Sequence, residues 1–462
     1  MSWPSLIALA ARAVACARTA SYRAPKPRLG VLNSSLSKLD HLDNANNYCQ
    51  VYGGIIDRAA AWLGGHTHHV QGAQVMSDVV IVDAVRTPIG KRNGALKEAH
   101  PVDLGSRVLT ELVSRSGIEP AIVEDVIFGC VTQIGDQASN VARNSWLAAG
   151  FPFTVAASTV TRACGSSQAA VHFAAALIQS EACDVIIGGG VESMTRVPLG
   201  SAANSGSGTP YPPSVQELYD LVPQGISAQL MARKYGVSRR QMDEYSVRSH
   251  QLASAATKGG RLRSQIAPVE VNGSGLVSQD EGIRADANYE AISMLKPAFD
   301  PQHDITAGNA SQISDGAAAV LLMSADKAKE LGLRARARVV AHVVVGVDPI
   351  IMLEGPIPAT AAVLKKARLT LADIDLFEVN EAFASVVLAW QKSTGADIDK
   401  VNVNGGAISV GHPLGASGAR LLCHLLYELE RRDLRYGLEA MCCGGGLGTA
   451  TIIERLNGHT DA

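Results

Sequence analysis

Two cysteines and one histidine stand in segments of small residues, where their side chains could act together. Cys164 precedes Gly-Ser-Ser, His412 lies within Val-Gly-His-Pro-Leu-Gly, and Cys442 comes two residues before a glycine triplet. A thiol nucleophile, a base that deprotonates it and a second thiol that carries a proton are the groups needed for acyl transfer through a thioester. These residues therefore point to covalent catalysis on a cysteine.

Cys164 stands between an apolar, β-branched run, 154–161, that we predict to be a buried strand, and an alanine-rich segment, 165–180, that we predict to be a buried helix. A lone cysteine is more often a small hydrophobic residue of the core. At the start of a helix, however, the dipole and the unpaired N–H groups favour a thiolate and can bind an oxyanion. Position alone leaves the catalytic and the packing interpretations open.

The other candidates also have simpler interpretations. His412 could be a turn histidine, although glycines around it let the backbone approach a ligand closely. Cys442 and Cys443 could be core residues at a strand end. Asn380 follows a predicted buried strand, and the carboxyl ends of strands are where α/β sheets bind ligands.

Short apolar strands alternate with alanine-rich helices after Met76, which predicts parallel sheet covered on both faces. The segment at 123–129, which contains a predicted buried strand, is echoed at 373–379, and the helix start at 165–170 is echoed at 415–420, both with an offset of 250 residues. We therefore predict an α/β fold built from two similar halves around a pseudo-twofold axis.

Between the halves the chain is richer in charge, Gly, Ser and Pro, apart from an amphipathic helical stretch at 238–258. That composition is typical of an inserted domain, which we expect to lie over the active site. The predicted regions are an N-terminal extension at 1–75, a first half at 76–193 with 313–333, an inserted loop domain at 194–312, and a second half at 334–457.

The N-terminal extension contains basic residues and no acidic residue before Lys38. Three interpretations remain open: a mitochondrial presequence, a disordered extension, or sequence translated from upstream of the true start. We expect no chemistry from it.

Composition narrows the class of protein. The 462 residues carry a net charge of −2 and are 47% hydrophobic, so nucleic acid is not an expected partner. No apolar run is long enough to span a membrane. The eight cysteines lack a paired CxxC, which argues against a zinc site and indicates free thiols in a reducing compartment. We expect a cytoplasmic protein, or a mitochondrial one if 1–75 is a presequence.

Together these segments resemble one family, the thiolases, which comprise acetyl-CoA acetyltransferases and 3-ketoacyl-CoA thiolases. The resemblance covers about 76–456. Four further stretches typical of the family are 85–90, 280–284, 307–311 and 314–318. The resemblance implies a five-layer α-β-α-β-α core and reversible, CoA-dependent thiolysis of 3-ketoacyl-CoA, or condensation of two acetyl-CoA, through an acyl-cysteine. It also implies acyl-CoA and coenzyme A as substrates, no cofactor or metal, and a homodimer or homotetramer.

By the same resemblance, Cys164 is the nucleophile and His412 the base that activates it. Asn380 fixes a water that forms one oxyanion site with His412, and the N–H groups of Cys164 and Gly444 form a second. Cys442 exchanges a proton with the reacting carbon. For that task we expect its pKa to lie closer to neutrality than is usual for a thiol.

Two weaker assignments concern coenzyme A. Ser311 matches a residue along the pantetheine path, and Arg284 matches one near the nucleotide end. The chain also departs from the family, because Thr161 stands where many members have Asn or Asp, and Gln224 stands where Met is frequent. These departures bear on substrate choice, and the chain looks most like a bacterial lipid- or steroid-catabolic branch.

Two other classes are alternatives. A ketosynthase-type condensing enzyme shares the duplicated fold and the cysteine nucleophile, but has a second histidine or an asparagine where this chain has Cys442. A catalytically silent, lipid-binding thiolase-like protein should lack at least one of Cys164, His412 and Cys442, and this chain has all three.

Overall fold

The computed structural model of the protein describes residues 77–204, 206 and 208–456. The expectations for the N-terminal extension at 1–75 lie outside the described residues and stay predictions.

In the described residues, ten strands form one mixed sheet, and a separate two-stranded hairpin lies in the insertion. The sheet has the order β10-β11-β12-β9-β1-β8-β5-β3-β4, with β2 paired to β8. The strands are β1 Val79–Arg86, β2 Gly90–Lys91, β3 Asp125–Gly129, β4 Ala156–Val160, β5 Val185–Ser193, β6 Val269–Val271, β7 Gly275–Val277, β8 Ser314–Ser324, β9 Ala337–Gly346, β10 Leu376–Val379, β11 Tyr436–Cys443 and β12 Leu447–Arg455.

The helices connect and cover these strands. Their bounds are α3 Pro101–Ser116, α4 Val141–Ala148, α5 Ser166–Gln179, α6 Ser201–Asn204, α7 Pro213–Gln216, α8 Gln224–Lys234, α9 Arg239–Lys258, α10 Tyr289–Ser293, α11 Ala325–Glu330, α12 Pro356–Ala367, α13 Ala384–Thr394 and α14 Ser417–Arg432.

The pairing of strands repeats between the two halves, residue by residue. Val126 of β3 lies opposite Ile187 of β5, and Leu376 of β10 lies opposite Gly437 of β11, which is the same register shifted by 250 residues. Helices α3, α4 and α5 of the first half correspond in order to α12, α13 and α14 of the second. The predicted duplication and the α/β class are confirmed.

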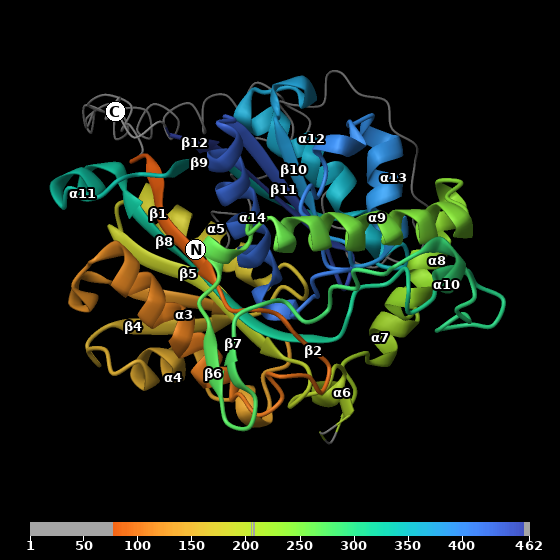
Figure 1. The fold of residues 1–462 in the computed structure, drawn as a ribbon, viewed down its shortest axis with the longest axis horizontal. Coiled ribbons are helices and arrows are strands. Elements are labelled where there is room, and N and C mark those ends of the chain that lie inside the picture. The colour runs from red at the N-terminus through yellow and green to blue at the C-terminus, as the bar shows by residue number, and fades with distance from the viewer. Residues whose placement is uncertain (1–76, 205, 207, 457–462) are drawn as a thin grey trace, which may run out of the picture. The chain divides into compact units, whose positions relative to one another are not determined.

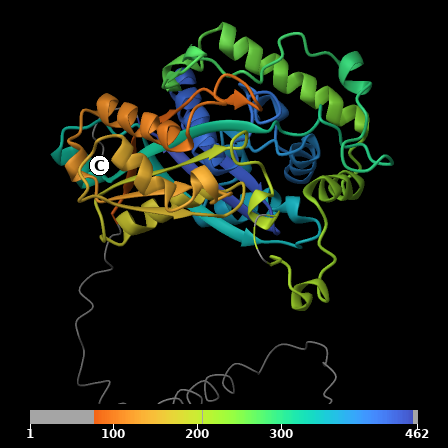
Figure 2. The same cartoon turned by 90° about the horizontal axis from the view of Figure 1, so that it is seen from below.

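The elements form five layers (Figures 1 and 2). Helices α3 and α4 cover the first-half part of the sheet, and α12 covers the second-half part. Helix α13 packs beside α12 and places Trp390 against Phe377 of β10, and α5 packs on α14 between the two parts. The strands of the two halves form one continuous sheet, because β1 of the first half pairs with β9 of the second. Where the halves meet, a Cβ at Gly190 would lie 2.1 Å from the carbonyl oxygen of Gly415, so only glycine permits this approach.

Two details differ from the expectation of buried elements. The strand expected at 154–161 is β4, an edge strand whose residues are exposed or half-buried. Helix α5 is buried except on one side, where Phe173 is exposed under the guanidinium of Arg162. Apolar composition did not distinguish an edge strand from a central one.

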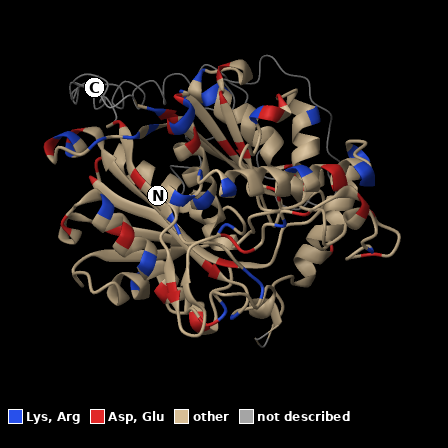
Figure 3. Cartoon of the chain, viewed as in Figure 1, with Lys and Arg blue, Asp and Glu red and all other residues tan. Residues whose placement is uncertain are grey.

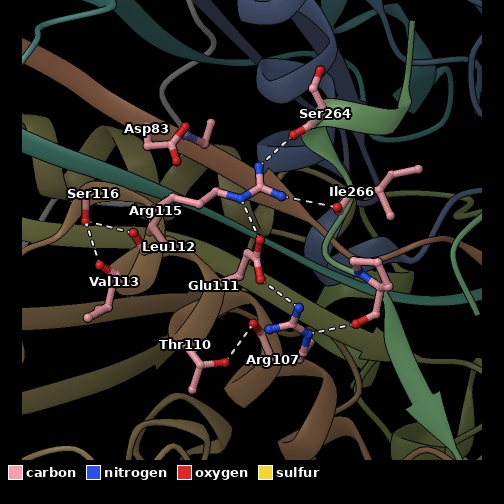
Figure 4. A network of polar contacts seen from close by, with 12 residues as sticks. Asp83, Arg107, Thr110, Glu111, Leu112, Val113, Arg115, Ser116, Ser264 and Ile266 are labelled. Atoms are coloured by element: carbon pink, nitrogen blue, oxygen red, sulfur yellow. Dashed lines mark hydrogen bonds and ion pairs between the residues drawn. The ribbon is translucent and has the colours of Figure 1, made fainter. Parts of the chain in front are cut away.

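The insertion between β5 and β8 is fixed to the first half by two sets of polar contacts. Buried Arg86 donates to both carboxylate oxygens of Asp280, at 2.7 and 2.9 Å. On α3, Glu111 lies between two arginines that donate to backbone carbonyls of the insertion (Figure 4). These bonds run from Arg107 to Pro268 and from Arg115 to Ser264 and Ile266.

The predicted helix at 238–258 is α9, which begins with a capping box between Ser238 and Gln241. In the view of Figure 3, positive and negative residues are interspersed over both halves. Among the described helices, none combines the length and apolarity required to cross a membrane. The six described cysteines are free thiols.

Candidate active site

A cavity of about 740 Å³ opens where the two halves and the insertion meet. Four of the predicted site residues line it: Cys164, His412, Gly444 and Ser311. Most of the other lining side chains are apolar. They include Val131, Met194, Leu199, Leu221, Val222, Phe299, Met352, Phe383 and Leu414.

Cys164 lies one residue before the N-cap of α5, as predicted. The turn that presents it is tight, because Ala163 has φ +45°, a conformation that is unusual for a residue with a side chain. Ser166 stabilises the turn, since its hydroxyl donates to the carbonyl of Ala163 at 2.6 Å and accepts from the N–H of Arg162 at 2.8 Å. Sequence position and local strain together direct the thiol into the cavity.

His412 is buried, and its hydrogen bonds define its tautomer. The Ser417 hydroxyl donates to the carbonyl of Pro413 at 2.8 Å, so its oxygen accepts from His412 Nδ1, 2.5 Å away. Nδ1 therefore carries the proton, and Nε2 carries the lone pair that accepts hydrogen bonds. The amide Nδ2 of Asn380 lies 3.2 Å from that Nε2.

Asn380 is fully buried at the end of β10, and its own N–H donates to the carbonyl of Ala440. Its side-chain oxygen has no hydrogen-bond partner among the described residues. A buried acceptor without a partner is costly unless a water or ligand satisfies it. The predicted role of Asn380 in holding a water fits this free acceptor.

Cys442 and Cys443 end β11 and point to opposite faces of the strand, as neighbours in a strand do. Cys442 is fully buried, and the Cys164 thiol raises its pKa. Cys443 faces the start of α5, where a Cβ at Gly165 would be 2.6 Å from its Sγ. The Cys164 thiol raises the pKa of both cysteines, so both lie near it, and the assignment of Cys442 as the second catalytic thiol stays a prediction.

The expectation that the pKa of Cys442 approaches neutrality is wrong for this structure. Burial, followed by the Cys164 and Cys443 thiols, raises the pKa of Cys442 well above its ordinary value. The N–H group of Cys442 itself lowers the pKa but does not outweigh that desolvation. Cys442 is therefore a neutral thiol at rest and a proton donor.

The start of α5 does not give Cys164 a thiolate at rest. Burial raises the pKa of Cys164 to about 11, although the N–H groups of Gly444 and Cys164 and the side-chain amide of Gln224 lower it. Burial, followed by the positive charge of Arg420, lowers the pKa of His412 to about 3. The resting pair is a neutral thiol and a neutral imidazole, so the proton moves only as the sulfur attacks.

Ser311 and Arg284 line neighbouring cavities. Ser311 lines the 740 Å³ cavity, and Arg284 lines a second one of about 260 Å³ together with His250 of α9. Gln312 lines both. The two cavities are thus adjacent, as an extended ligand that reaches from the thiol to the insertion requires.

Two buried glutamates that the sequence analysis did not single out fix the backbone of the site. Glu192 accepts hydrogen bonds from the N–H groups of Val131, Thr132 and Gly415, at 2.8, 3.0 and 2.9 Å. The strand register makes it the counterpart of Cys442 in the first half. The 250-residue offset could therefore have identified Glu192 as a residue of the site from the sequence.

Glu381, next to Asn380, joins three segments. It accepts from the hydroxyls of Tyr245 and Ser249 on α9, at 2.8 and 2.7 Å, and from the N–H of Ile408 at 3.0 Å. The insertion is thereby connected to the loop that carries His412. Ser417 was also missed as a site residue, although it lies in the repeated helix start.

In the described residues, no cluster of three His, Cys, Asp or Glu side chains could hold a metal ion. The groups available for chemistry among the described residues of the site are the thiols of Cys164 and Cys442, the neutral imidazole of His412 and the amide of Asn380.

Comparison with known proteins agrees with this geometry. The sequence model of the thiolase N-terminal domain matches residues 79–326, and that of the thiolase C-terminal domain matches 333–455. A steroid 3-ketoacyl-CoA thiolase from Mycobacterium tuberculosis is 49% identical over 390 residues, which are 83% of this chain and 95% of the relative. A 3-ketoacyl-CoA thiolase from Klebsiella pneumoniae is 44% identical over 391 residues, 82% of this chain and 100% of the relative.

Solved structures agree as well. The acetyl-CoA acetyltransferase of Bacillus anthracis has a TM-score of 0.76 and 41% identity, covering 83% of this chain and 100% of that one. Human mitochondrial 3-ketoacyl-CoA thiolase has a TM-score of 0.76 and 37% identity, covering 82% and 99%. With both domains matched along the sequence and the two cysteines, the histidine and the asparagine gathered at the junction of the halves, the chain belongs to the thiolase family.

Proposed function

We propose that the protein is an acyltransferase that catalyses reversible, CoA-dependent thiolysis of 3-ketoacyl-CoA through an acyl-Cys164 intermediate. The observation that carries the proposal is the meeting of Cys164, His412 and Gly444 in one cavity, with the buried thiol of Cys442 near that of Cys164. Coenzyme A acts as a substrate, and the reaction needs no further cofactor.

In the first half-reaction, Cys164 gives its proton to His412 Nε2 and its sulfur attacks the C3 carbonyl. The carbonyl π electrons move to oxygen, and the N–H groups of Cys164 and Gly444 stabilise the oxyanion. When the carbonyl re-forms, the C2–C3 bond breaks and its electron pair passes to C2. His412 and a water on Asn380 stabilise the resulting enolate, and Cys442 donates a proton to C2 to release acetyl-CoA.

In the second half-reaction, the Cys442 thiolate takes the proton of the CoA thiol. The CoA sulfur attacks the thioester, the second oxyanion forms in the same N–H site, and the bond to Cys164 breaks. His412 returns its proton to the Cys164 sulfur, so all three groups regain their resting protonation states. Splitting the cleavage into two transfers predicts ping-pong kinetics.

The acyl group that the cavity favours is larger than acetyl and apolar. Its volume of about 740 Å³ falls in the usual range for sites that enclose drug-sized ligands, and most of its wall is apolar. The names of two relatives, a steroid 3-ketoacyl-CoA thiolase and a 3-ketoacyl-CoA thiolase, are consistent with such substrates. We therefore place the chain in lipid catabolism.

A substrate panel tests the proposed activity. We expect kcat/KM for thiolysis to rise from acetoacetyl-CoA to 3-ketoacyl-CoA esters with long or ring-containing acyl groups, because each buried methylene contributes about 1–3 kcal/mol, or roughly 10- to 200-fold. Absence of thiolysis with every ester would reject the activity, whereas preference for acetoacetyl-CoA would reject only the assignment of acyl size.

The protein also has a surface suited to self-association. Strand β4 pairs only with β3 among the described strands and is largely exposed, and exposed Phe153 precedes it. Unprotected strand edges pair readily with another chain. We propose a homodimer in which this edge takes part, with a tetramer as a further association of dimers.

A further inference from the structure

We propose that the side-chain amide of Gln224 is a third donor to the oxyanion that forms on the carbonyl bonded to Cys164, beside the N–H groups of Cys164 and Gly444. This inference rests on the proposed acyl transfer. It concerns a residue that differs from the methionine frequent in thiolases and gives it a catalytic contact.

The position of Gln224 carries the inference. It is the first residue of α8 and lines the same cavity wall as Cys164 and Gly444. A Cβ at Gly444 would lie 2.9 Å from Gln224 Nε2, so the amide occupies the space directly over that backbone. The amide also lowers the pKa of the Cys164 thiol, as the N–H of Gly444 does.

The first turn of α8, which carries Gln224, is held in place by aromatic packing. Gly225, which follows it, is buried against the ring of Phe299, where a Cβ would come within 2.2 Å of Cγ. Phe299 in turn packs edge-on against Phe383, with ring centroids 6.1 Å apart. Because Phe383 directly precedes α13, the first turn of α8 is fixed relative to the second half. A donor held this way needs little reorganisation when charge develops.

The chemistry explains why an amide is useful here. Before attack, the sulfur is the most electron-rich atom near the donors. Once the carbon–sulfur bond has formed, the negative charge moves to the carbonyl oxygen next to that sulfur. A neutral amide N–H can change its acceptor from the sulfur to the nearby carbonyl oxygen, whereas a methionine side chain has no donor. Removing one donor to a charged oxygen costs roughly 10- to 100-fold in rate.

The test is the substitution Gln224→Met, which removes the donor while keeping an unbranched side chain of similar length. We expect kcat for thiolysis to fall roughly 10- to 100-fold with a smaller change in KM. We also expect the pH midpoint for alkylation of Cys164 by iodoacetamide to rise. Gln251→Met, the same change at an exposed site on α9, is the control and should leave both quantities unchanged.

Gln224→Glu is a second variant, in case the methionine variant unfolds, as judged by thermal denaturation. It replaces the donor with an acceptor and should lower kcat and raise the alkylation midpoint at least as much. Unchanged kcat and an unchanged midpoint in the folded variants, or a change in KM and chain-length preference alone, would overturn the inference. Failure of the wild-type protein to form acyl-Cys164 would instead reject the acyl transfer on which it rests.

Discussion

Replacing Ser417 with alanine is predicted to impair the base without touching the substrate. The serine hydroxyl is committed as a donor to the carbonyl of Pro413, so its oxygen accepts the proton of His412 Nδ1 at 2.5 Å. This contact directs the basic Nε2 toward Asn380 and the cavity. In Ser417→Ala the Nδ1–H group loses its acceptor inside a fully buried site.

The size of the effect follows from desolvation. A buried donor left without a partner costs about 1–3 kcal/mol. The cost is greater once His412 carries the charge of the Cys164 proton, so most of it falls on the attack step. A barrier increase of this size lowers the acylation rate roughly 5- to 150-fold. The other tautomer offers no relief, because its Nε2–H would face the NH₂ group of Asn380.

Stopped-flow acylation of Cys164 by an acyl-CoA measures this rate directly. Ser417→Thr, which keeps the hydroxyl, should recover much of the loss. Ser246→Ala is a matched control, because that buried hydroxyl donates only to a carbonyl within α9, at 2.8 Å. Acylation by Ser417→Ala at the wild-type rate would show that the tautomer of His412 is not set by Ser417.

Three further predictions follow from the structure. Cys442→Ser should leave acylation of Cys164 by acetyl-CoA largely intact and slow carbon–carbon cleavage severely, whereas Cys443→Ser should affect both steps mildly. Burst labelling of Cys164, measured beside steady-state thiolysis, distinguishes the two variants. The reverse result would exchange the roles of the two cysteines. Light scattering at micromolar concentration should give at least a dimer, and a stable monomer would refute the role of the β4 edge. Glu428, with its carboxylate bonded to Arg431, Asn404 and Arg432, has its pKa lowered from 4.5 to about 2 although burial opposes the shift. Its contribution to stability is therefore complete above pH 4.5 and lost as pH falls toward about 2, so acid titration of unfolding should be shallower in Glu428→Gln, and an identical titration would exclude this contribution.

Much of the fold could be predicted because the sequence contains an internal duplication. The 250-residue offset fixed the correspondence of β3 with β10 and of α5 with α14, and the strand register reproduces it. The meeting of Cys164 and His412 in one cavity was expected from the family resemblance and is observed. The amphipathic pattern of α9 and its capping serine were likewise sufficient to predict that helix.

What could not be predicted depends on burial and on contacts between distant segments. The dipole of α5 suggested a thiolate, but desolvation outweighs it and keeps Cys164 neutral. The same balance reverses the expected shift for Cys442. Gln224 was visible only as a departure from the family, because its place beside Cys164 and Gly444 in the cavity wall depends on how α8 packs in the fold. Likewise, apolar residues in β4 gave no sign that the strand lies at an edge.

The central claim is that the acyl group passes through Cys164. Mass spectrometry of the protein after incubation with a 3-ketoacyl-CoA, in the absence of free coenzyme A, tests it most directly. We predict an added mass equal to the shortened acyl group on the peptide that contains Cys164, released when coenzyme A is added, and neither adduct nor turnover in Cys164→Ala. An acyl adduct that persists in Cys164→Ala, or thiolysis by that variant at the wild-type rate, would contradict the account.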